Sequence, residues 1–166
     1  MTEVKMSDDT ISTVLTPSVT YDEAREGIRW LVDVLGFEVA SAYEDPNGRI
    51  AFAELFWRTG IVFVSQKSQQ EPWSGAGPAS IALAAENAAE VDRHYERALA
   101  SSADIVRALH DSITPAFPLG SHQFDVRDPG GNLWTIGTFQ PRISRSGSSA
   151  FRQNKTRDLL GRPRQA

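Results

Sequence analysis

An internal repeat of the order strand, helix, strand, strand, strand constrains this chain more than any other feature of its sequence. In residues 12–66, a β-prone stretch precedes a helical pattern that ends at Leu35, where Gly36 suits a C-terminal helix cap. Three strands are expected after it, over residues 37–43, 49–57 and 61–65. The order returns in residues 79–140, with a helix over 88–101 and strands over 79–85, 105–109, 122–127 and 133–139. Such a repeat indicates two similar modules that stabilise each other.

The repeat predicts an α+β fold made of two tandem βαβββ modules. In each module the helix covers one face of the sheet, so the other face stays open, and pairing the two sheets makes a curved mixed sheet around a cavity with the helices outside. The repeat divides the sequence into an N-terminal extension (1–11), the first module (12–66), a linker loop (67–78), the second module (79–140) and a basic tail (141–166). We expect the tail to be flexible.

Charge is divided unevenly along the chain. The last 26 residues hold seven of the 17 basic residues and one of the 21 acidic residues, which leaves 10 basic and 20 acidic residues before them. An acidic body disfavours nucleic acid and favours cationic partners. We expect the basic tail to fold over this body or to stay solvated, and a nucleic-acid-binding arm is the alternative.

The sequence contains no cysteine, so any metal ion would depend on His, Asp, Glu or Gln side chains. The histidines are His94, His110 and His122. No apolar run reaches the roughly 20 residues of a membrane helix, and the first residues do not look like a signal peptide. These features predict a cytoplasmic protein without a membrane partner.

Three stretches resemble the vicinal oxygen chelate superfamily, which includes glyoxalases, bleomycin resistance proteins and extradiol dioxygenases. They are TPSVTYDEAREGIRWLVDVLGFE, VDRHYERALASSADIV and FDVRDPGGNLWTIGTF, and the similarity covers about residues 12–140. The ending WTIGTF is similar to a bacterial subgroup described as glyoxalase-like. The resemblance implies a homodimer. The enzymes of the superfamily bind a divalent metal through residues on the first and last strands of each module, so the resemblance directs attention to the corresponding positions here.

In this chain the positions that correspond to those metal ligands carry other residue types. By register against the family pattern they are Thr16, Ser80 and Thr135, and the internal repeat places the fourth near Val64. Hydroxyl and aliphatic side chains bind zinc or iron poorly, so the resemblance predicts the fold without a metal or another cofactor.

Side chains that could face a ligand occur on the strand over residues 49–57. Alternation places Phe52, Glu54 and Phe56 on the open face, opposite a helix-packed face that includes Leu55 and Trp57. A carboxylate beside two phenylalanines could exchange protons or pair with a cation. The alternatives for Glu54 are an arginine partner in the same sheet and a solvated strand end.

The remaining candidates are aromatic residues and histidines. Trp73, in the linker, is expected to stack on a planar ligand or, alternatively, to pack on its own body or on a dimer partner. His122 begins a strand and is expected to point toward the pocket, whereas His94 is expected to face solvent and His110 to lie in a loop. Trp30 and Trp134 are expected in the core.

Three functions are compatible with this pattern. The first is a metal-independent protein that sequesters a small molecule, such as an aromatic or cationic antibiotic or natural product, through Thr16, Ser80, Thr135 and the candidates above. The second is an enzyme on the same scaffold, either a metal-dependent lyase or dioxygenase or a metal-free catalyst that uses Glu54 or His122. The third is an interaction protein whose basic tail docks elsewhere.

Overall fold

The computed structural model describes residues 15–68, 77–114 and 117–140, with side chains described outside 113–119. The first module contains β1 (Ser18–Tyr21), α1 (Ala24–Trp30), η1 (Leu31–Leu35), β2 (Glu38–Glu44), β3 (Ile50–Trp57) and β4 (Gly60–Gln66). The second contains β5 (Ser80–Ala84), α2 (Ala88–Ala100), β6 (Asp104–Thr114), β7 (Phe117–Arg127) and β8 (Leu133–Gly137). The expected N-terminal extension, Trp73 and the basic tail lie outside the described residues.

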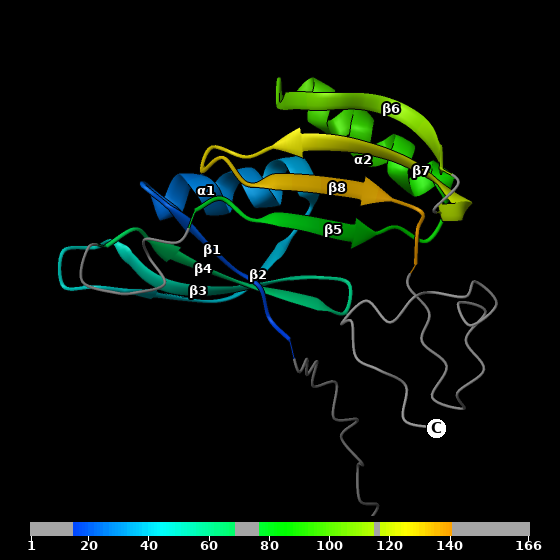
Figure 1. The fold of residues 1–166 in the computed structure, drawn as a ribbon. Coiled ribbons are helices and arrows are strands. Elements are labelled where there is room, and N and C mark those ends of the chain that lie inside the picture. The colour runs from blue at the N-terminus through cyan, green and yellow to red at the C-terminus, as the bar shows by residue number, and fades with distance from the viewer. Residues whose placement is uncertain (1–14, 69–76, 115–116, 141–166) are drawn as a thin grey trace, which may run out of the picture.

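The strands form two separate four-stranded mixed sheets (Figure 1). The order is β1-β4-β3-β2 in the first sheet and β5-β8-β7-β6 in the second. In each sheet the first strand runs parallel to the last strand of its module, and the other pairs are antiparallel. The predicted α+β fold of two βαβββ modules is therefore confirmed, with sheets that do not close into a barrel.

The two modules repeat in hydrogen-bonding detail. The amide of Phe63 donates to the carbonyl of Pro17 at 2.9 Å, and the amide of Leu133 donates to the carbonyl of Ala79 at the same distance. Because these bonds occupy the same place in each module, they superimpose Ser18 on Ser80 and, two residues beyond each amide donor, Ser65 on Thr135. This superposition sets which side chains share the open faces.

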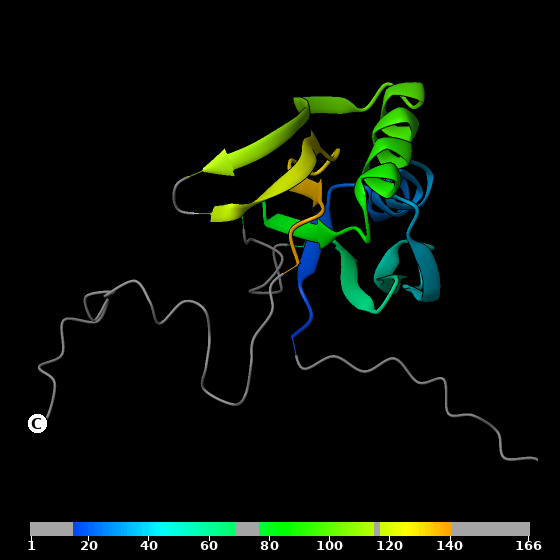
Figure 2. The same cartoon turned by 90° about the vertical axis from the view of Figure 1, so that its right-hand side faces the viewer.

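Side-chain alternation in β3 follows the predicted faces from Phe52 to Trp57, but not at the start of the strand, where Ile50, expected on the open face, is buried and Ala51, expected on the helix-packed face, is exposed. Ala53, Leu55 and Trp57 are buried toward the helices, whereas Phe52, Glu54 and Phe56 are half-buried on the open face. A single hydrophobic core joins both modules, and α2 packs against η1 as well as its own sheet (Figure 2).

The first helix ends where the sequence indicates, although its second half has an unexpected form. Gly36 has φ +75°, a left-handed conformation that glycine adopts without strain, and it caps the helix after Leu35. Residues Leu31–Leu35 form a π-helical segment rather than a continuation of α1. In α2 the side chain of Asn87 accepts a hydrogen bond from the amide of Glu90, a standard N-terminal cap.

The second module departs from the expectation between its second and third strands. The sequence predicts a short strand over 105–109 and then a loop with two prolines, but β6 and β7 are each 11 residues long and pair from Asp104 with Arg127 to Thr114 with Phe117. Register shifts along this ladder absorb the irregular residues, which is why a period-2 pattern was not visible.

Among the described residues, no helix is long and apolar enough to cross a membrane.

Candidate functional site

The open face of the second sheet carries a pocket of about 290 Å³. Small side chains form most of its wall, together with four polar side chains and one aromatic ring. The lining is Ala82, Leu83, Ser112, Gly120, Ser121, Gln123, Thr135, Gly137 and Phe139. A Cβ atom at Gly137 would lie 2.7 Å from Ser121 Oγ and 2.9 Å from Gln123 Cβ. The glycine therefore lets β7 side chains lie close over β8 and shapes the pocket floor.

A buried carboxylate lies beside the pocket wall. Asp125 is only 8% exposed, and it accepts a hydrogen bond of 2.6 Å from the hydroxyl of Thr135. The guanidinium of Arg107 lies 3.6 Å from the other carboxylate oxygen, so the charge of Asp125 is compensated. Because Thr135 uses its hydrogen on Asp125, its oxygen can act only as an acceptor toward the pocket. Sequence reasoning missed Asp125, although polar residues at 121, 123 and 125 alternate with buried Phe124 and Val126.

The open face of the first sheet is aromatic. The rings of Tyr43 and Phe52 stack with centroids 6.3 Å apart, and Phe52 contacts Phe63 with centroids 4.9 Å apart. Glu54 lies on this face, where it accepts a hydrogen bond of 2.6 Å from the hydroxyl of Ser41. The arginine partner considered for Glu54 does not occur among the described contacts. Glu54, Phe52 and Phe56 line neither of the two described pockets.

The structure separates the four predicted ligand positions. Thr135 and Ser80 lie on the open face of the second sheet, where Ser80 is exposed. Thr16 is half-buried just before β1, and it is corrected as the counterpart of Ser80, because the residue equivalent to Ser80 in the first module is Ser18. Val64 is corrected: it is fully buried on the helix-facing side, and the residue equivalent to Thr135 is Ser65. The side-chain oxygen of Ser65 is buried without a hydrogen-bond partner among the described atoms.

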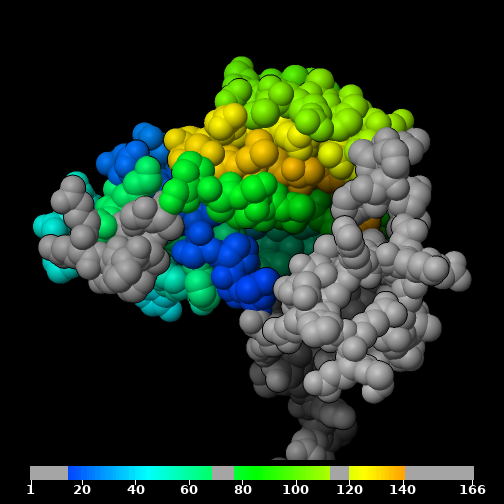
Figure 3. Space-filling view, in the orientation of Figure 1, coloured from blue at the N-terminus to red at the C-terminus, as the bar shows by residue number. Residues whose placement is uncertain are grey.

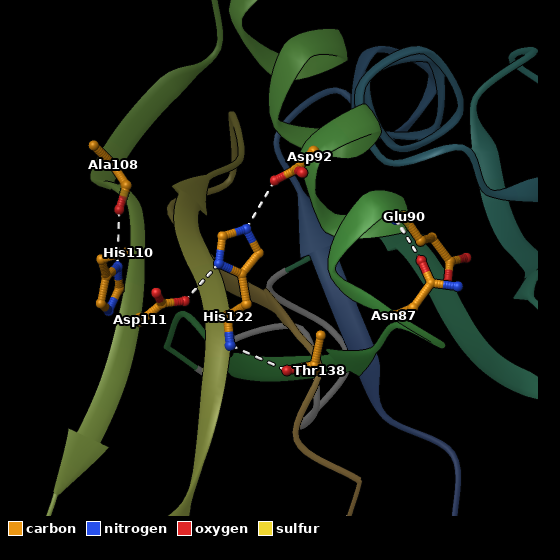
Figure 4. A network of polar contacts seen from close by, with 8 residues as sticks. All are labelled: Asn87, Glu90, Asp92, Ala108, His110, Asp111, His122 and Thr138. Carbon is orange, nitrogen blue, oxygen red and sulfur yellow. Dashed lines mark hydrogen bonds and ion pairs between the residues drawn. The ribbon is translucent and has the colours of Figure 1, made fainter.

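His122 lies on the helix-facing side of β7, away from the open-face pocket for which the sequence suggested it (Figure 4). Its Nδ1 is 2.7 Å from Asp111 of β6, and its Nε2 is 2.8 Å from Asp92 of α2. These hydrogen bonds, to Asp92 first and Asp111 second, raise the pKa of His122 above its usual 6.5. Each ring nitrogen faces a carboxylate, and both nitrogens donate only when the ring is protonated. In that form His122 ties α2, β6 and β7 together, with a carboxylate partner on each of its ring nitrogens.

This arrangement predicts a pH dependence of stability. A neutral imidazole has one N–H and can donate to only one of the two carboxylates. Because the pKa of His122 is raised in the folded protein, protonated His122 stabilises the fold fully below about pH 6.5, and this stabilisation is lost as the pH rises through the pKa of the folded state. Because the side chains are partly exposed, we expect a loss of less than about 1 kcal/mol between pH 6 and 9. Urea unfolding of the wild type and of Asp92→Asn at several pH values measures this loss. The free energy of unfolding of the variant should depend less on pH than that of the wild type, and an equal dependence would contradict a stabilising ion pair between His122 and Asp92.

The other histidines and the core tryptophans also have defined places. His94 is not solvent-facing as expected: it is half-buried with its ring 5.7 Å from that of Trp57, and burial lowers its pKa. His110 lies in β6 rather than in a loop. Trp134 is fully buried, as predicted, and Trp30 is half-buried against the core. Within the described residues, no group of three or more His, Asp or Glu side chains could hold a metal ion.

Two βαβββ modules with an uncovered sheet face each define the class of protein. A family model described as the Glyoxalase/Bleomycin resistance protein/Dioxygenase superfamily matches residues 11–136. The chain belongs to this superfamily, as the sequence resemblance predicted.

Solved structures extend the comparison. TioX from Micromonospora sp. ML1 is 30% identical, with 76% of this chain and 98% of that chain covered and a TM-score of 0.62. Lactoylglutathione lyase from Agrobacterium tumefaciens is 20% identical, with 76% and 92% covered and a TM-score of 0.57. A virulence protein from Salmonella typhimurium is also 20% identical, with 77% and 97% covered and a TM-score of 0.55. The last two similarities show the fold alone. No curated protein matches the chain.

Proposed function

We propose that this protein binds a small organic molecule on the open faces of its sheets, without a metal ion, and acts by sequestration. The observation that carries the proposal is the pocket on the second sheet, whose volume is at the lower end of the range for small-molecule sites. Its wall combines small apolar side chains with the acceptor oxygen of Thr135 and the amide of Gln123. A planar compound with a donor group suits this chemistry, such as an aromatic antibiotic or natural product.

The first sheet offers a second surface of the same kind. Its stacked rings, Tyr43, Phe52 and Phe63, are suited to contact a flat ligand, and the carboxylate of Glu54 lies among them. In the described chain these residues and Thr135 do not line one pocket. We therefore propose a cytoplasmic homodimer in which a second copy brings an open aromatic face to the pocket.

The enzymatic alternative rests on Glu54 after the placement of His122. No described contact gives Glu54 a partner other than Ser41, so no feature of its surroundings favours catalysis over binding. We keep sequestration as the proposal.

Calorimetric titration with a panel of planar aromatic antibiotics tests the function. Ser112 lines the pocket from β6, and Ser112→Trp should fill it and weaken binding of the best ligand by at least about tenfold, equivalent to about 1.4 kcal/mol. Ala108→Trp, at an exposed position of the same strand outside the lining, is the matched control and should bind normally.

The same titration tests metal independence, and sedimentation of the complex tests assembly. The dissociation constant should be unchanged in the presence of EDTA, and sedimentation should show that the binding species is a dimer. A ligand that binds only with added divalent metal would overturn metal independence. An absence of binding across the panel would overturn the proposed function.

A further inference from the structure

A larger cavity of about 490 Å³ lies between the two sheets, and it borders the open-face pocket at Ala82 and Leu83, which line both. Its wall runs from the end of the β3–β4 hairpin to β5, and Figure 3 shows the surface hollowed beneath β5. The wall is mostly aromatic and aliphatic: Ile61, Ile81 and Leu83 are half-buried, Trp57 keeps 8% of its surface exposed, and Phe37 and Trp134 are buried beside them. We call this cavity the seam cavity.

The aromatic rings of the seam cavity are held in place by the core. The indole N–H of Trp57 donates to the carbonyl of Leu35 at 3.1 Å, and the ring also contacts His94. Phe37 meets Trp134 edge to face, with centroids 5.6 Å apart. A preformed wall of this kind can receive an apolar ring system without a large cost in side-chain entropy.

The described lining contains one ionisable side chain, the guanidinium of Arg58, and no carboxylate. Arg58 lies in the turn between β3 and β4 with φ +57°, a left-handed conformation that is unfavourable for any residue with a Cβ atom. In this conformation its guanidinium carbon lies 5.8 Å from the centroid of the Trp57 ring. The turn thus places a cation at a cavity whose other described lining is mostly apolar, with Thr59 and Gln140 as its neutral polar side chains.

The charge of Arg58 is only partly neutralised. Its Nη1 donates to Glu90 at 3.0 Å, and the side chain remains 42% exposed. A guanidinium has five N–H donors, and the described contacts occupy one of its terminal nitrogens. The same carboxylate oxygen of Glu90 also accepts from the amide of Glu86, so Glu90 is shared between two donors.

From the cavity, its fixed aromatic wall and its single cation, we propose that the seam cavity is a second ligand site, which takes an aromatic organic anion. The ring system lies against the accessible edge of Trp57 and the half-buried side chains of Ile61 and Ile81, and the carboxylate or sulfonate pairs with Arg58. Charge complementarity decides the class, because a cationic ligand would meet the guanidinium with no described carboxylate in the wall. This site meets the open-face pocket at Ala82 and Leu83, but Arg58 and Trp57 line only the seam cavity, so the proposal does not depend on the function proposed for the other pocket.

Two matched probes test the proposal: 8-anilinonaphthalene-1-sulfonate, an aromatic anion, and N-phenyl-1-naphthylamine, the same ring system without the sulfonate. Fluorescence titration of the full chain should show binding of both probes. Arg58→Gln should weaken the anionic probe by about fivefold, the upper end for an accessible ion pair, and leave the neutral probe unchanged. Glu90→Gln should strengthen binding of the anionic probe, because this variant removes the carboxylate that pairs with the guanidinium of Arg58. The side-chain amide oxygen introduced at position 90 can still accept the hydrogen bond from the backbone amide of Glu86.

Opposite effects of these two variants separate a ligand contact from a structural ion pair. Equal weakening of both probes by Arg58→Gln and Glu90→Gln, with lowered melting temperatures, would overturn the proposal. So would an absence of binding to the wild type. Ser112→Trp, which fills the open-face pocket, should leave both probes unaffected, and loss of probe binding in that variant would place the probe in the other pocket and overturn the proposal.

Discussion

Replacing Asp128 by Ala is expected to reduce the free energy of unfolding by about 3–5 kcal/mol, a large part of the stability of a chain of this size. Asp128 is 4% exposed and accepts hydrogen bonds from the hydroxyl of Tyr21 at 2.6 Å and the indole of Trp134 at 2.9 Å. It also accepts from the backbone amides of Gly130 and Asn132 and from the Asn132 side chain. Its removal strands several buried donors, each at a cost of about 1–3 kcal/mol.

Two variants serve as controls for Asp128. Tyr21→Phe removes one donor and keeps the carboxylate, so it should cost about 1–2 kcal/mol. Asp45→Ala removes an aspartate from a second Asp-Pro turn, where the described bonds to its side chain come from the exposed amides of Asn47 and Arg49, and should cost at most about 1 kcal/mol. Urea denaturation measures all three. Similar losses for Asp128→Ala and Asp45→Ala would show that the carboxylate acts only within its turn.

The two aspartates show what the sequence could and could not predict. Asp45-Pro46-Asn47-Gly48 and Asp128-Pro129-Gly130-Gly131 both have the composition of a turn, because aspartate accepts hydrogen bonds from backbone amides and proline restricts its neighbours. Only the structure shows that Asp128 also binds Tyr21, a residue 107 positions earlier in the other module. Local sequence patterns indicate hydrogen bonds within a turn, so the hydrogen bond between Tyr21 of the first module and Asp128 of the second was not visible in the sequence.

Register explains the correction at Val64. Element type and order followed from hydrophobic periodicity and the repeat, but a slip of one residue in a strand moves a side chain to the other face. Counting along the chain selected Val64, whereas the parallel hydrogen bonds between β1 and β4 select Ser65. The site is less predictable than the fold for this reason.

The role of His122 was hidden for a different reason. Its two carboxylate partners, Asp92 and Asp111, come from α2 and β6, which are 30 and 11 residues away along the chain. A histidine at the beginning of a strand looks the same in sequence whether it faces a ligand or a pair of aspartates. Its environment depends on tertiary packing that no spacing rule contains.

Gly27→Ala is expected to destabilise the protein by about 2 kcal/mol, although alanine is the better helix former. A Cβ atom at Gly27 would lie 2.4 Å from the Cγ and Cδ2 atoms of the Tyr21 ring, closer than such atoms approach in proteins. The ring cannot move away freely, because its hydroxyl is bound to Asp128 and the backbone of Gly130 also lies close to it, since a Cβ atom built there would be 2.8 Å from Tyr21 Cδ1. Overpacking therefore outweighs the gain of about 1 kcal/mol in helix propensity.

A reversal of sign isolates the cause of the Gly27 effect. In a Tyr21→Ala background the ring is absent, so adding Gly27→Ala should be neutral or should stabilise the protein by up to about 1 kcal/mol. Gly77→Ala, where no atom lies within 4 Å of the new Cβ, is the control and should change stability very little. Urea unfolding of the four members of the cycle gives the coupling energy. If Gly27→Ala destabilised both backgrounds equally, the contact with Tyr21 would not be its cause, and the close approach of α1 to β1 would need another explanation.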